Sequence, residues 1–351
     1  MNAASAATAS AAQVRVALQE ADPTQPVAAS LQRLVRLGLD RLPMPGSGAT
    51  RERWQVLAAV AEFDLSLAKL YEGHTDALAI LTELGALSPG TNGVAQPATW
   101  CVWAAESPQG RTLIEPQADG SVRLHGAKFW CSGADTASHA LLTAWYPDKR
   151  GPQLVRIALD QPGVTVVADG WHAVGMAAST SLTVQFDDAI GSTVGDCGQY
   201  LARPGFWQGG AGIAACWLGG ARGIALALFS SSQLRGEGLR AQLGLSALGK
   251  VDMALEAAGA TLREAARWID AHPRDDASEV ALRARLVIEE AARRVLDEAG
   301  RALGATPFCR DRSFARAAAD LPVFIRQSHA ERDCIALGER LLSSEASPWM
   351  L

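Results

Sequence analysis

The sequence predicts an α+β fold: a helical N-terminal domain, a middle domain that is an antiparallel β-barrel or β-sandwich, and a four-helix C-terminal domain. Changes in apolar periodicity predict it. Apolar residues recur every three or four positions from about residue 26 to 86, at every second position between about 99 and 195, and again at helical spacing from 204 onward. We expect a flexible leader at 1–25 and domains at 26–98, 99–196 and 197–351.

The first domain is predicted to be helical from its apolar spacing. Trp54, Leu57 and Val60 lie three residues apart, and Leu67 and Leu70 repeat that spacing. The stretch LSPGTNGVAQP that follows is rich in Gly, Pro and Asn, so it is expected to be a loop. Before the helices, MNAASAATASAAQVRV has neither a basic start nor a continuous apolar core. It is therefore expected to be a flexible leader and not a signal peptide.

The middle domain contains short alternating segments that are typical of strands. They are TWCVWAA, SVRLHGAKFW, HALLTAWY, QLVRIAL, VTVVAD and SLTVQF, and the turn clusters SPQG, ADG, PDKRG and QPG separate them. Short strands at this spacing, without helix-length interruptions, favour a small antiparallel barrel or sandwich.

The C-terminal domain opens with an almost wholly apolar stretch from Ala211 to Phe229. Its length approaches that of a membrane span, but Arg222 near its middle and the charged helices around it favour a helix buried in a soluble protein. Three glycines would let a neighbouring backbone approach it closely: Gly219, Gly220 and Gly223. Further helices follow, the last from about Leu321 to Leu342, and self-association into a dimer or tetramer would cover the apolar helix.

Composition excludes several classes of protein. The chain is 48% hydrophobic and 20% charged with a net charge of −5, and its basic residues alternate with acidic ones, so no nucleic-acid or membrane surface is predicted. Six cysteines show neither a CxxC pair nor a Cys/His ligand spacing. We expect reduced thiols in a cytoplasmic protein without a metal site.

The segment KFWCSGA ends one alternating run and carries the strongest local signal. Residues two apart in a strand share a face, so Trp130 and Ser132 would place an indole and a hydroxyl side by side. Such a surface suits a flat polar ring. The alternative is a Trp that fills the core and a Ser that begins a turn.

This segment and the order of the domains resemble the acyl-CoA dehydrogenase superfamily of flavoproteins. DGSVRLHGAKFWCSGADTASHALLTA is similar to the family's Gly-x-Lys-x-Trp-Ile-Thr-Asn region, with Lys128, Trp130 and Ser132 on its Lys, Trp and Thr. QPGVTVVADGWHAVGMAASTSLTVQFDDA, VAEFDLSLAKLYEGHTDAL and GFWQGGAGIAACWLGGARGIALAL resemble further family segments in the same order.

The resemblance implies a small-molecule oxidoreductase that binds FAD, or alternatively FMN. Trp130 would pack on the isoalloxazine ring, and the Ser132 hydroxyl would lie near flavin N5. The other implied cofactor-binding residues are Cys131 within this segment, Val102 and Trp103 on the preceding strand, and Gly304.

The chain also departs from the family pattern. Where the family has Thr-Glu-Pro-x-Ala-Gly-Ser-Asp, it has VWAAESPQG, with Trp103 at the Thr position. The Arg-Phe motif that grips the cofactor pyrophosphate from the next subunit is replaced by SSSQLRGEG. The Gln-x-x-Gly-Gly-x-Gly element appears as RALGATPF, which keeps only Gly304. These changes affect the contacts of the adenine half of FAD and leave FMN as an alternative.

The family's catalytic glutamate has no counterpart. Its usual position falls on Ser328, followed by His329, and its alternative position early in the apolar helix is not acidic either. Three classes remain open. The first is a divergent acyl-CoA dehydrogenase-like enzyme in which Glu331 or His329 moves the proton. The second is a two-component monooxygenase supplied by a flavin reductase, in which His329 steadies the oxygenated flavin. The third is a non-catalytic homologue.

Overall fold

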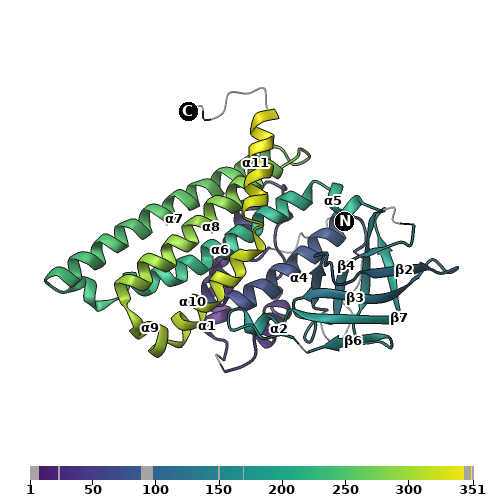
Figure 1. Ribbon diagram of the computed structural model, residues 1–351, viewed down its shortest axis with the longest axis horizontal. Coiled ribbons are helices and arrows are strands. Elements are labelled where there is room, and N and C mark those ends of the chain that lie inside the picture. The colour runs from purple at the N-terminus through teal and green to yellow at the C-terminus, as the bar shows by residue number, and fades with distance from the viewer. Residues whose placement is uncertain are drawn as a thin grey trace, which may run out of the picture. The chain divides into compact units, whose positions relative to one another are not determined.

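The computed structural model describes residues 8–22, 24–87, 98–148, 151–168, 170–343 and 349. The chain forms two compact units (Figure 1). The first comprises residues up to 44, 66–173 and 177–206, and the second comprises 45–65, 174–176 and 207–351. The predicted boundary at 98 therefore marks a change from helix to strand inside the first unit.

Helices α1 (Ala11–Gln19) and α2 (Val27–Arg36) begin the first unit. The expectation of a flexible leader is wrong for α1, because Ser10 and Gln13 form a capping box. The Ser10 hydroxyl accepts from the Gln13 backbone N–H at 3.3 Å, and the Gln13 side chain accepts from the Ser10 backbone N–H at 2.9 Å. This pairing satisfies two N–H groups at the start of the helix.

The β-sheet of the first unit has seven strands, one more than the sequence predicts. They are β1 (Trp100–Trp103), β2 (Thr112–Pro116), β3 (Val122–Cys131), β4 (His139–Trp145), β5 (Pro152–Ala158), β6 (Val164–Val167) and β7 (Leu182–Val194). The unpredicted strand is β2, whose alternation is limited to buried Thr112 and Ile114. The predicted loop after the helices falls mainly on residues 88–97, outside those described.

The strands close into a small barrel. Pairing runs from β4 through β2, β3, β7 and β5, and β5 pairs again with β4, while β1 and β6 extend the edges. The predicted barrel is present, but it is mixed rather than antiparallel because β1 and β2 both pair with β4 in parallel. Alternation along one strand identifies its buried face, but it does not specify the direction of its neighbour.

Helix α4 (Leu65–Glu83) packs on the outside of this barrel. Its residues Ala77, Ile80 and Leu81 share a buried cluster with Leu141 and Leu154 of the sheet. The barrel interior holds a second apolar cluster that contains Trp103, Leu124 and Cys131, among others. The short helices η2 (Ala177–Ser179) and α5 (Gln199–Ala202) complete the unit.

The second unit is helical. Its main helices are α3 (Thr50–Phe63), α6 (Gly205–Phe229), α7 (Leu239–Ala271), α8 (Ser278–Leu303), α9 (Ala305–Arg310), α10 (Arg312–Phe324) and α11 (Glu331–Ser343), with the short helices η3 (Ser232–Arg235) and η4 (Ile325–Gln327). In Figure 1, α7 and α8 are long neighbouring helices. The predicted single helix at the C-terminus is interrupted between α10 and α11.

Close packing of α3 on α6 confirms the role expected for two of the α6 glycines. A Cβ on Gly219 would lie 2.2 Å from the Ala58 carbonyl oxygen, and one on Gly223 would lie 3.1 Å from that of Glu62. At Gly220 the close neighbour is the Leu65 side chain rather than a backbone. Helix α6 is long and apolar enough to cross a membrane, but 67% of its most apolar window is buried inside the structure.

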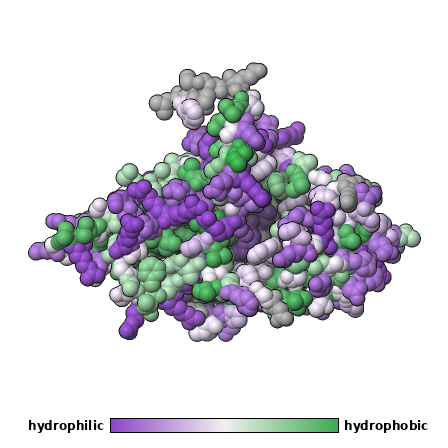
Figure 2. Space-filling model, in the orientation of Figure 1, coloured by the Kyte–Doolittle hydropathy of each residue, from purple (hydrophilic) through white to green (hydrophobic). Residues whose placement is uncertain are grey.

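Apolar side chains also remain on the surface of the second unit. Figure 2 shows hydrophobic patches among hydrophilic side chains over α9–α11, where Phe308, Val323 and Ile335 are exposed. Helix α7 exposes Leu239, Leu243 and Met253.

Candidate functional site

A β-bulge at the end of β3 determines where Trp130 points. Lys128 pairs with Val184 of β7, and Cys131 pairs with Leu182. The chain thus advances three residues on β3 and two on β7, so β3 carries one extra residue there. Trp130 has a φ of 61°, which is uncommon for an aromatic residue, and its side chain is exposed.

This geometry overturns the interpretation of Trp130 as a core residue, because 64% of its surface is exposed. The expectation that Trp130 and Ser132 share one face of a regular strand does not apply to this geometry. Strict alternation stops at the bulge, and Ser132 lies in the turn after the strand. The Ser132 backbone N–H donates to the Trp130 carbonyl at 3.1 Å.

Three serine hydroxyls form a chain beside this turn. The Ser132 hydroxyl lies 2.7 Å from that of Ser181, which lies 3.2 Å from that of Ser179. In addition, the backbone N–H of Gly133 donates to the Ser179 carbonyl at 2.9 Å. Sequence reasoning missed Ser181, although it lies in QPGVTVVADGWHAVGMAASTSLTVQFDDA, one of the segments that resemble the family. The two loops therefore present hydroxyls that can donate or accept hydrogen bonds.

The neighbouring residues predicted to bind cofactor have mainly inward-facing side chains. Trp103 and Cys131 are buried in the barrel, and Val102 is half-buried and packs against the cluster under α4. The Trp103 indole N–H donates to the Ser132 carbonyl at 3.1 Å. Burial raises the pKa of the Cys131 thiol. The side chains of Trp103 and Cys131 thus support the exposed turn from below and do not line its surface.

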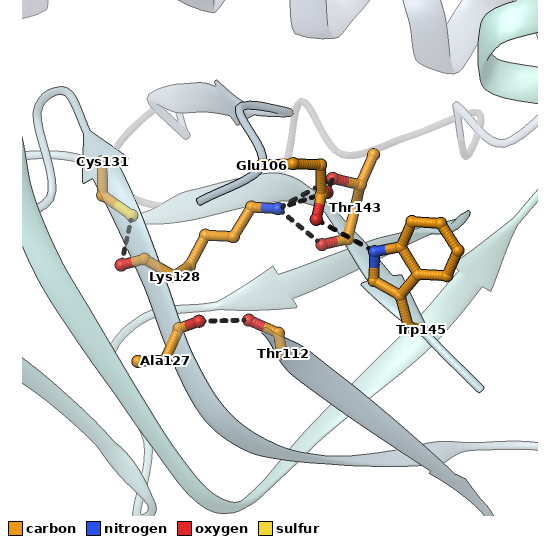
Figure 3. Close-up of polar contacts among 7 residues, drawn as sticks. All are labelled: Glu106, Thr112, Ala127, Lys128, Cys131, Thr143 and Trp145. Atoms are coloured by element: carbon orange, nitrogen blue, oxygen red, sulfur yellow. Dashed lines mark hydrogen bonds and ion pairs between the residues drawn. The ribbon is translucent and has the colours of Figure 1, made fainter. Parts of the chain in front are cut away.

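Lys128 is the centre of a polar cluster beneath the bulge (Figure 3). Its ammonium group lies 3.1 Å from a Glu106 carboxylate oxygen and donates to the Thr143 carbonyl at 2.9 Å and to the Thr143 hydroxyl at 2.8 Å. The Thr143 hydroxyl donates to Glu106 at 2.8 Å, and the Trp145 indole donates to the other Glu106 oxygen at 3.0 Å.

The pKa values of this ion pair follow from burial and hydrogen bonding. Desolvation lowers the pKa of Lys128, against the opposing charge of Glu106. Desolvation raises the pKa of Glu106, but the hydrogen bond from Thr143 and the charge of Lys128 together outweigh it, so this pKa is lowered.

The candidate catalytic residues of the second unit lie between η4 and α11. The Ser328 hydroxyl accepts from the Ala330 backbone N–H at 3.2 Å. His329 is exposed, and its Nδ1 lies 3.4 Å from a carboxylate oxygen of Asp333. Asp333 is buried, accepts the His329 backbone N–H at 3.2 Å and lies 3.7 Å from Nε of Arg285. Sequence reasoning missed Asp333, whose i+4 spacing from the histidine was the available signal.

Two further predicted residues lie at helix ends. Glu331 is exposed in the first turn of α11. Gly304 links α8 to α9 with a φ of 69°, and a Cβ there would meet nothing within 4 Å. The turn itself, rather than close packing, accounts for glycine at this position.

A shallow groove of about 470 Å³ also lies between α8 and α10. Its lining is mainly apolar, and two of its lining residues, Arg293 and Arg326, both pair with the buried carboxylate of Glu289. Among the residues described, no group of three or more His, Cys, Asp and Glu side chains is arranged to hold a metal ion.

Solved structures of known flavoproteins have the same fold over nearly the whole chain. A glutaryl-CoA dehydrogenase from Mycobacterium smegmatis in complex with FADH2 matches with a TM-score of 0.78 at 17% identity, covering 96% of this chain and 94% of its own. Butyryl-CoA dehydrogenase from Megasphaera elsdenii matches with a TM-score of 0.74 at 18% identity, covering 90% of this chain and 89% of its own. The chain has the acyl-CoA dehydrogenase fold.

Other proteins with this fold were solved with FMN and with small molecules other than CoA. KijD3 in complex with FMN and a dTDP-linked amino-keto sugar matches with a TM-score of 0.77 at 19% identity, over 96% of this chain and 92% of its own. TdsC from Paenibacillus sp. A11-2, a dibenzothiophene monooxygenase, was solved with FMN and indole; that complex matches with a TM-score of 0.76 at 20% identity, over 96% of each chain. At these identities the likeness shows the fold alone.

Curated relatives match over a shorter segment. The amino sugar nitrososynthase RubN8 from Streptomyces rubradiris is 38% identical over 80 residues, 22% of this chain and 19% of RubN8. The amino sugar nitrososynthase DnmZ from Streptomyces peucetius is 32% identical over 87 residues, 24% of this chain and 21% of DnmZ. The chain thus matches about a fifth of the length of these relatives. No family model matches the chain.

Proposed function

We propose that this protein is a flavin-dependent oxidoreductase that acts on a small molecule. The observation that carries the proposal is the exposed indole of Trp130, held on a β-bulge next to the turn that bears Ser132. An exposed aromatic face can stack on a flat ring, and nearby hydroxyls can bond to its polar edge. KijD3, TdsC and the glutaryl-CoA dehydrogenase share this fold, and their structures contain flavins.

FMN is the form of flavin that the chain's own residues favour. The segments that correspond to the family's pyrophosphate-binding elements read SSSQLRGEG and RALGATPF, and only Gly304 is retained from the second. Contacts that would distinguish FAD from FMN are therefore reduced, while the residues proposed to contact the ring, Trp130 and Ser132, are present. FAD remains the alternative.

Oxygen-dependent chemistry is a better proposal than dehydrogenation of a thioester. The sequence resemblance assigns Ser328 to the position of the family's glutamate, and the Ser328 hydroxyl accepts a backbone hydrogen bond from Ala330. A neutral hydroxyl without an adjacent base cannot remove a proton alpha to a carbonyl at neutral pH. A bound flavin supplies two-electron redox chemistry and, when reduced, reacts with oxygen. The resemblance to nitrososynthases and to a monooxygenase supports this choice.

His329 is the residue of this region best able to exchange a proton. Histidine is a common general acid or base in enzymes, and a neighbouring carboxylate orients its ring. The Asp333 carboxylate lies beside His329 Nδ1, so Nε2 is the ring nitrogen that can contact a substrate or a cofactor. Dehydrogenation with Glu331 as the base is the competing function.

The proposed function implies two protein partners, a flavin reductase and a second copy of this chain. A monooxygenase without its own source of electrons needs a flavin reductase. A second copy of the chain would cover the exposed apolar side chains of α7, among them Leu239, Leu243 and Met253. Light scattering at micromolar concentration tests self-association, and a stable monomer would exclude it.

Titration of the purified, flavin-free protein with FMN tests the proposal. Trp130→Ala should weaken FMN binding by about 1–3 kcal/mol, or about 5- to 150-fold, because base–aromatic stacking contributes that much in other proteins. Trp130→Phe should retain most of the affinity, since a ring remains at the position. Equal FMN affinity of the alanine variant and the unaltered protein would remove Trp130 from the site.

A further inference from the structure

We propose that the Lys128–Glu106 ion pair is a positioning element that holds the side chain of Trp130 outside the barrel. The inference rests on the proposed function only where flavin binding is the readout. The position of Trp130 itself can be measured without any ligand.

Regular alternation would turn Trp130 inward. Lys128 and Trp130 are two residues apart, so an undisturbed strand would direct both to the same face. Lys128 is 3% exposed and Trp130 is 64% exposed. The extra residue of the bulge and the positive φ of Trp130 account for this reversal. Some contact must therefore stabilise the bulged form against the regular strand.

The side chain of Lys128 provides that contact on one side of the bulge. All three of its acceptors lie outside β3: Glu106 follows β1, and Thr143 in β4 contributes both its carbonyl and its hydroxyl. An ammonium group has three donors, so these contacts satisfy it fully. Glu106 is fixed in turn by Thr143 and Trp145, as Figure 3 shows. The buried lysine cannot leave its place without losing a complete set of partners.

Backbone contacts hold the chain on both sides of Trp130. The Ala127 carbonyl accepts the Thr112 hydroxyl at 3.1 Å, and the Lys128 carbonyl accepts the Cys131 thiol at 3.2 Å. Beyond the bulge, the Ser132 carbonyl accepts the Trp103 indole. Trp130 thus stands between two anchored segments, and only the Lys128 anchor depends on an ion pair.

The cost of burying a lysine supports a positioning role. Lys128 is buried while Glu106 is 41% exposed, so the attraction between them must offset the desolvation of the lysine. Ion pairs with this cost are weak evidence for stability by themselves. A single, well-defined conformation is the advantage that it can bring. Here the conformation that it would select is the bulge that exposes Trp130.

The test uses the double variant Lys128→Met with Glu106→Gln, which leaves neither an unpaired lysine nor an unpaired carboxylate. Acrylamide quenching of tryptophan fluorescence is measured in flavin-free protein, with and without Trp130→Phe, so that the difference isolates Trp130. We expect the Trp130 contribution to quenching to fall severalfold in the double variant, because the indole turns inward. FMN affinity should fall with it.

A matched control is the ion pair of Arg203 and Glu83, also in the first unit. Its two side chains are 2.7 Å apart and 4% and 25% exposed, compared with 4% and 41% for Lys128 and Glu106. Arg203→Met with Glu83→Gln should change thermal stability without changing the quenching of Trp130. A general destabilisation of the first unit would instead change the quenching of Trp130 in both double variants.

The outcomes separate the two proposals. Unchanged quenching of Trp130 in a folded Lys128→Met, Glu106→Gln variant overturns the positioning role, whatever its effect on flavin. Quenching that falls in this variant alone supports it, even if the unaltered protein binds no FMN, and in that case only the proposed function fails. If the double variant does not fold, Thr143→Val, which removes one acceptor of Lys128, should give a smaller decrease, and unchanged quenching there also overturns the role.

Discussion

At the scale of single residues, the candidate site depends on a local departure from regular strand geometry. Trp130 adopts a φ of 61°, and Thr180, in the loop that meets its turn, adopts 39°. Such conformations are disfavoured for residues other than glycine and persist where surrounding contacts fix them. The Thr180 hydroxyl donates to Asp135 at 2.6 Å. Two constrained loops therefore frame the serine hydroxyls, of which those of Ser132 and Ser181 are half-buried and that of Ser179 is buried.

Ser132→Ala should affect bound flavin differently from Trp130→Ala. Loss of one neutral hydrogen bond costs about 1 kcal/mol, so FMN affinity should fall only about fivefold. The absorption spectrum or the reduction potential of the bound flavin should shift, because the environment of the ring edge changes. A spectrum and a potential identical to those of the unaltered protein would show that the hydroxyl does not reach the ring.

Glu106→Gln should destabilise the protein at neutral pH and lose this effect in acid. The pKa of Glu106 is lowered from 4.5 in the folded protein, so its ionised form contributes stability above pH 4.5 and loses it as the pH falls through the folded pKa. The difference in melting temperature between the variant and the unaltered protein should therefore be full at pH 7 and shrink below about pH 4.5. A constant difference across this range would contradict an ionised Glu106.

At the scale of secondary-structure elements, glycines decide how α3 and α6 meet. Gly219 lies against the backbone of Ala58, so no side chain fits there. The apolar sequence of α6 predicts its burial, but only the packed helices show which of its glycines face a backbone. A capping interaction also secures α3, because the Asp270 carboxylate on α7 accepts the Thr50 hydroxyl at 2.6 Å and the Thr50 backbone N–H at 3.1 Å.

Gly219→Ala should destabilise the second unit by about 1–3 kcal/mol or more, since the added methyl group overlaps a carbonyl that cannot move freely. Gly249→Ala on α7 is the matched control. That glycine is exposed and helical with nothing within 4 Å of its added Cβ, so the change should stabilise by about 0.5–1 kcal/mol. Chemical denaturation of both variants provides the comparison, and effects of equal sign would argue against the packing of α3 on α6.

At the scale of the whole molecule, one fold supports more than one chemistry. The fold is shared with CoA dehydrogenases and with TdsC, a monooxygenase, so it does not choose between them. We propose that the choice depends on the residues at the position of the family's glutamate. The sequence resemblance assigns that position to Ser328, followed by His329, whose Nδ1 lies 3.4 Å from the Asp333 carboxylate.

Oxidised, flavin-loaded protein should not be bleached by straight-chain acyl-CoA under anaerobic conditions, because the sequence resemblance assigns the usual position of the base to Ser328 and not to a carboxylate. Visible absorbance in an anaerobic titration measures this. His329→Ala should then change the time course of flavin re-oxidation when the reduced protein is mixed with oxygen. Bleaching by acyl-CoA would instead favour the dehydrogenase, and Glu331→Gln would be the first variant to examine.

The sequence by itself determined the order of helix, strand and helix, the resemblance to the superfamily and the importance of the segment around Trp130. Periodicity carries this information because buried faces must be apolar in every helix and strand. It did not identify β2, whose alternation is too short, or α1, where the capping box was overlooked, and it gave no direction to the pairing of β1 with β4.

Only the tertiary structure decided that Trp130 points outward. The two-residue period of a strand predicts the same face for Lys128, Trp130 and Ser132. It cannot reveal a β-bulge, because the bulge arises from pairing with a strand distant in sequence. The same is true of the partners of Lys128, because Glu106 and Thr143 are 22 and 15 residues away along the chain. Contacts between segments far apart in the sequence determine how the side chains of Trp130 and Lys128 are oriented, so local sequence patterns do not predict these orientations.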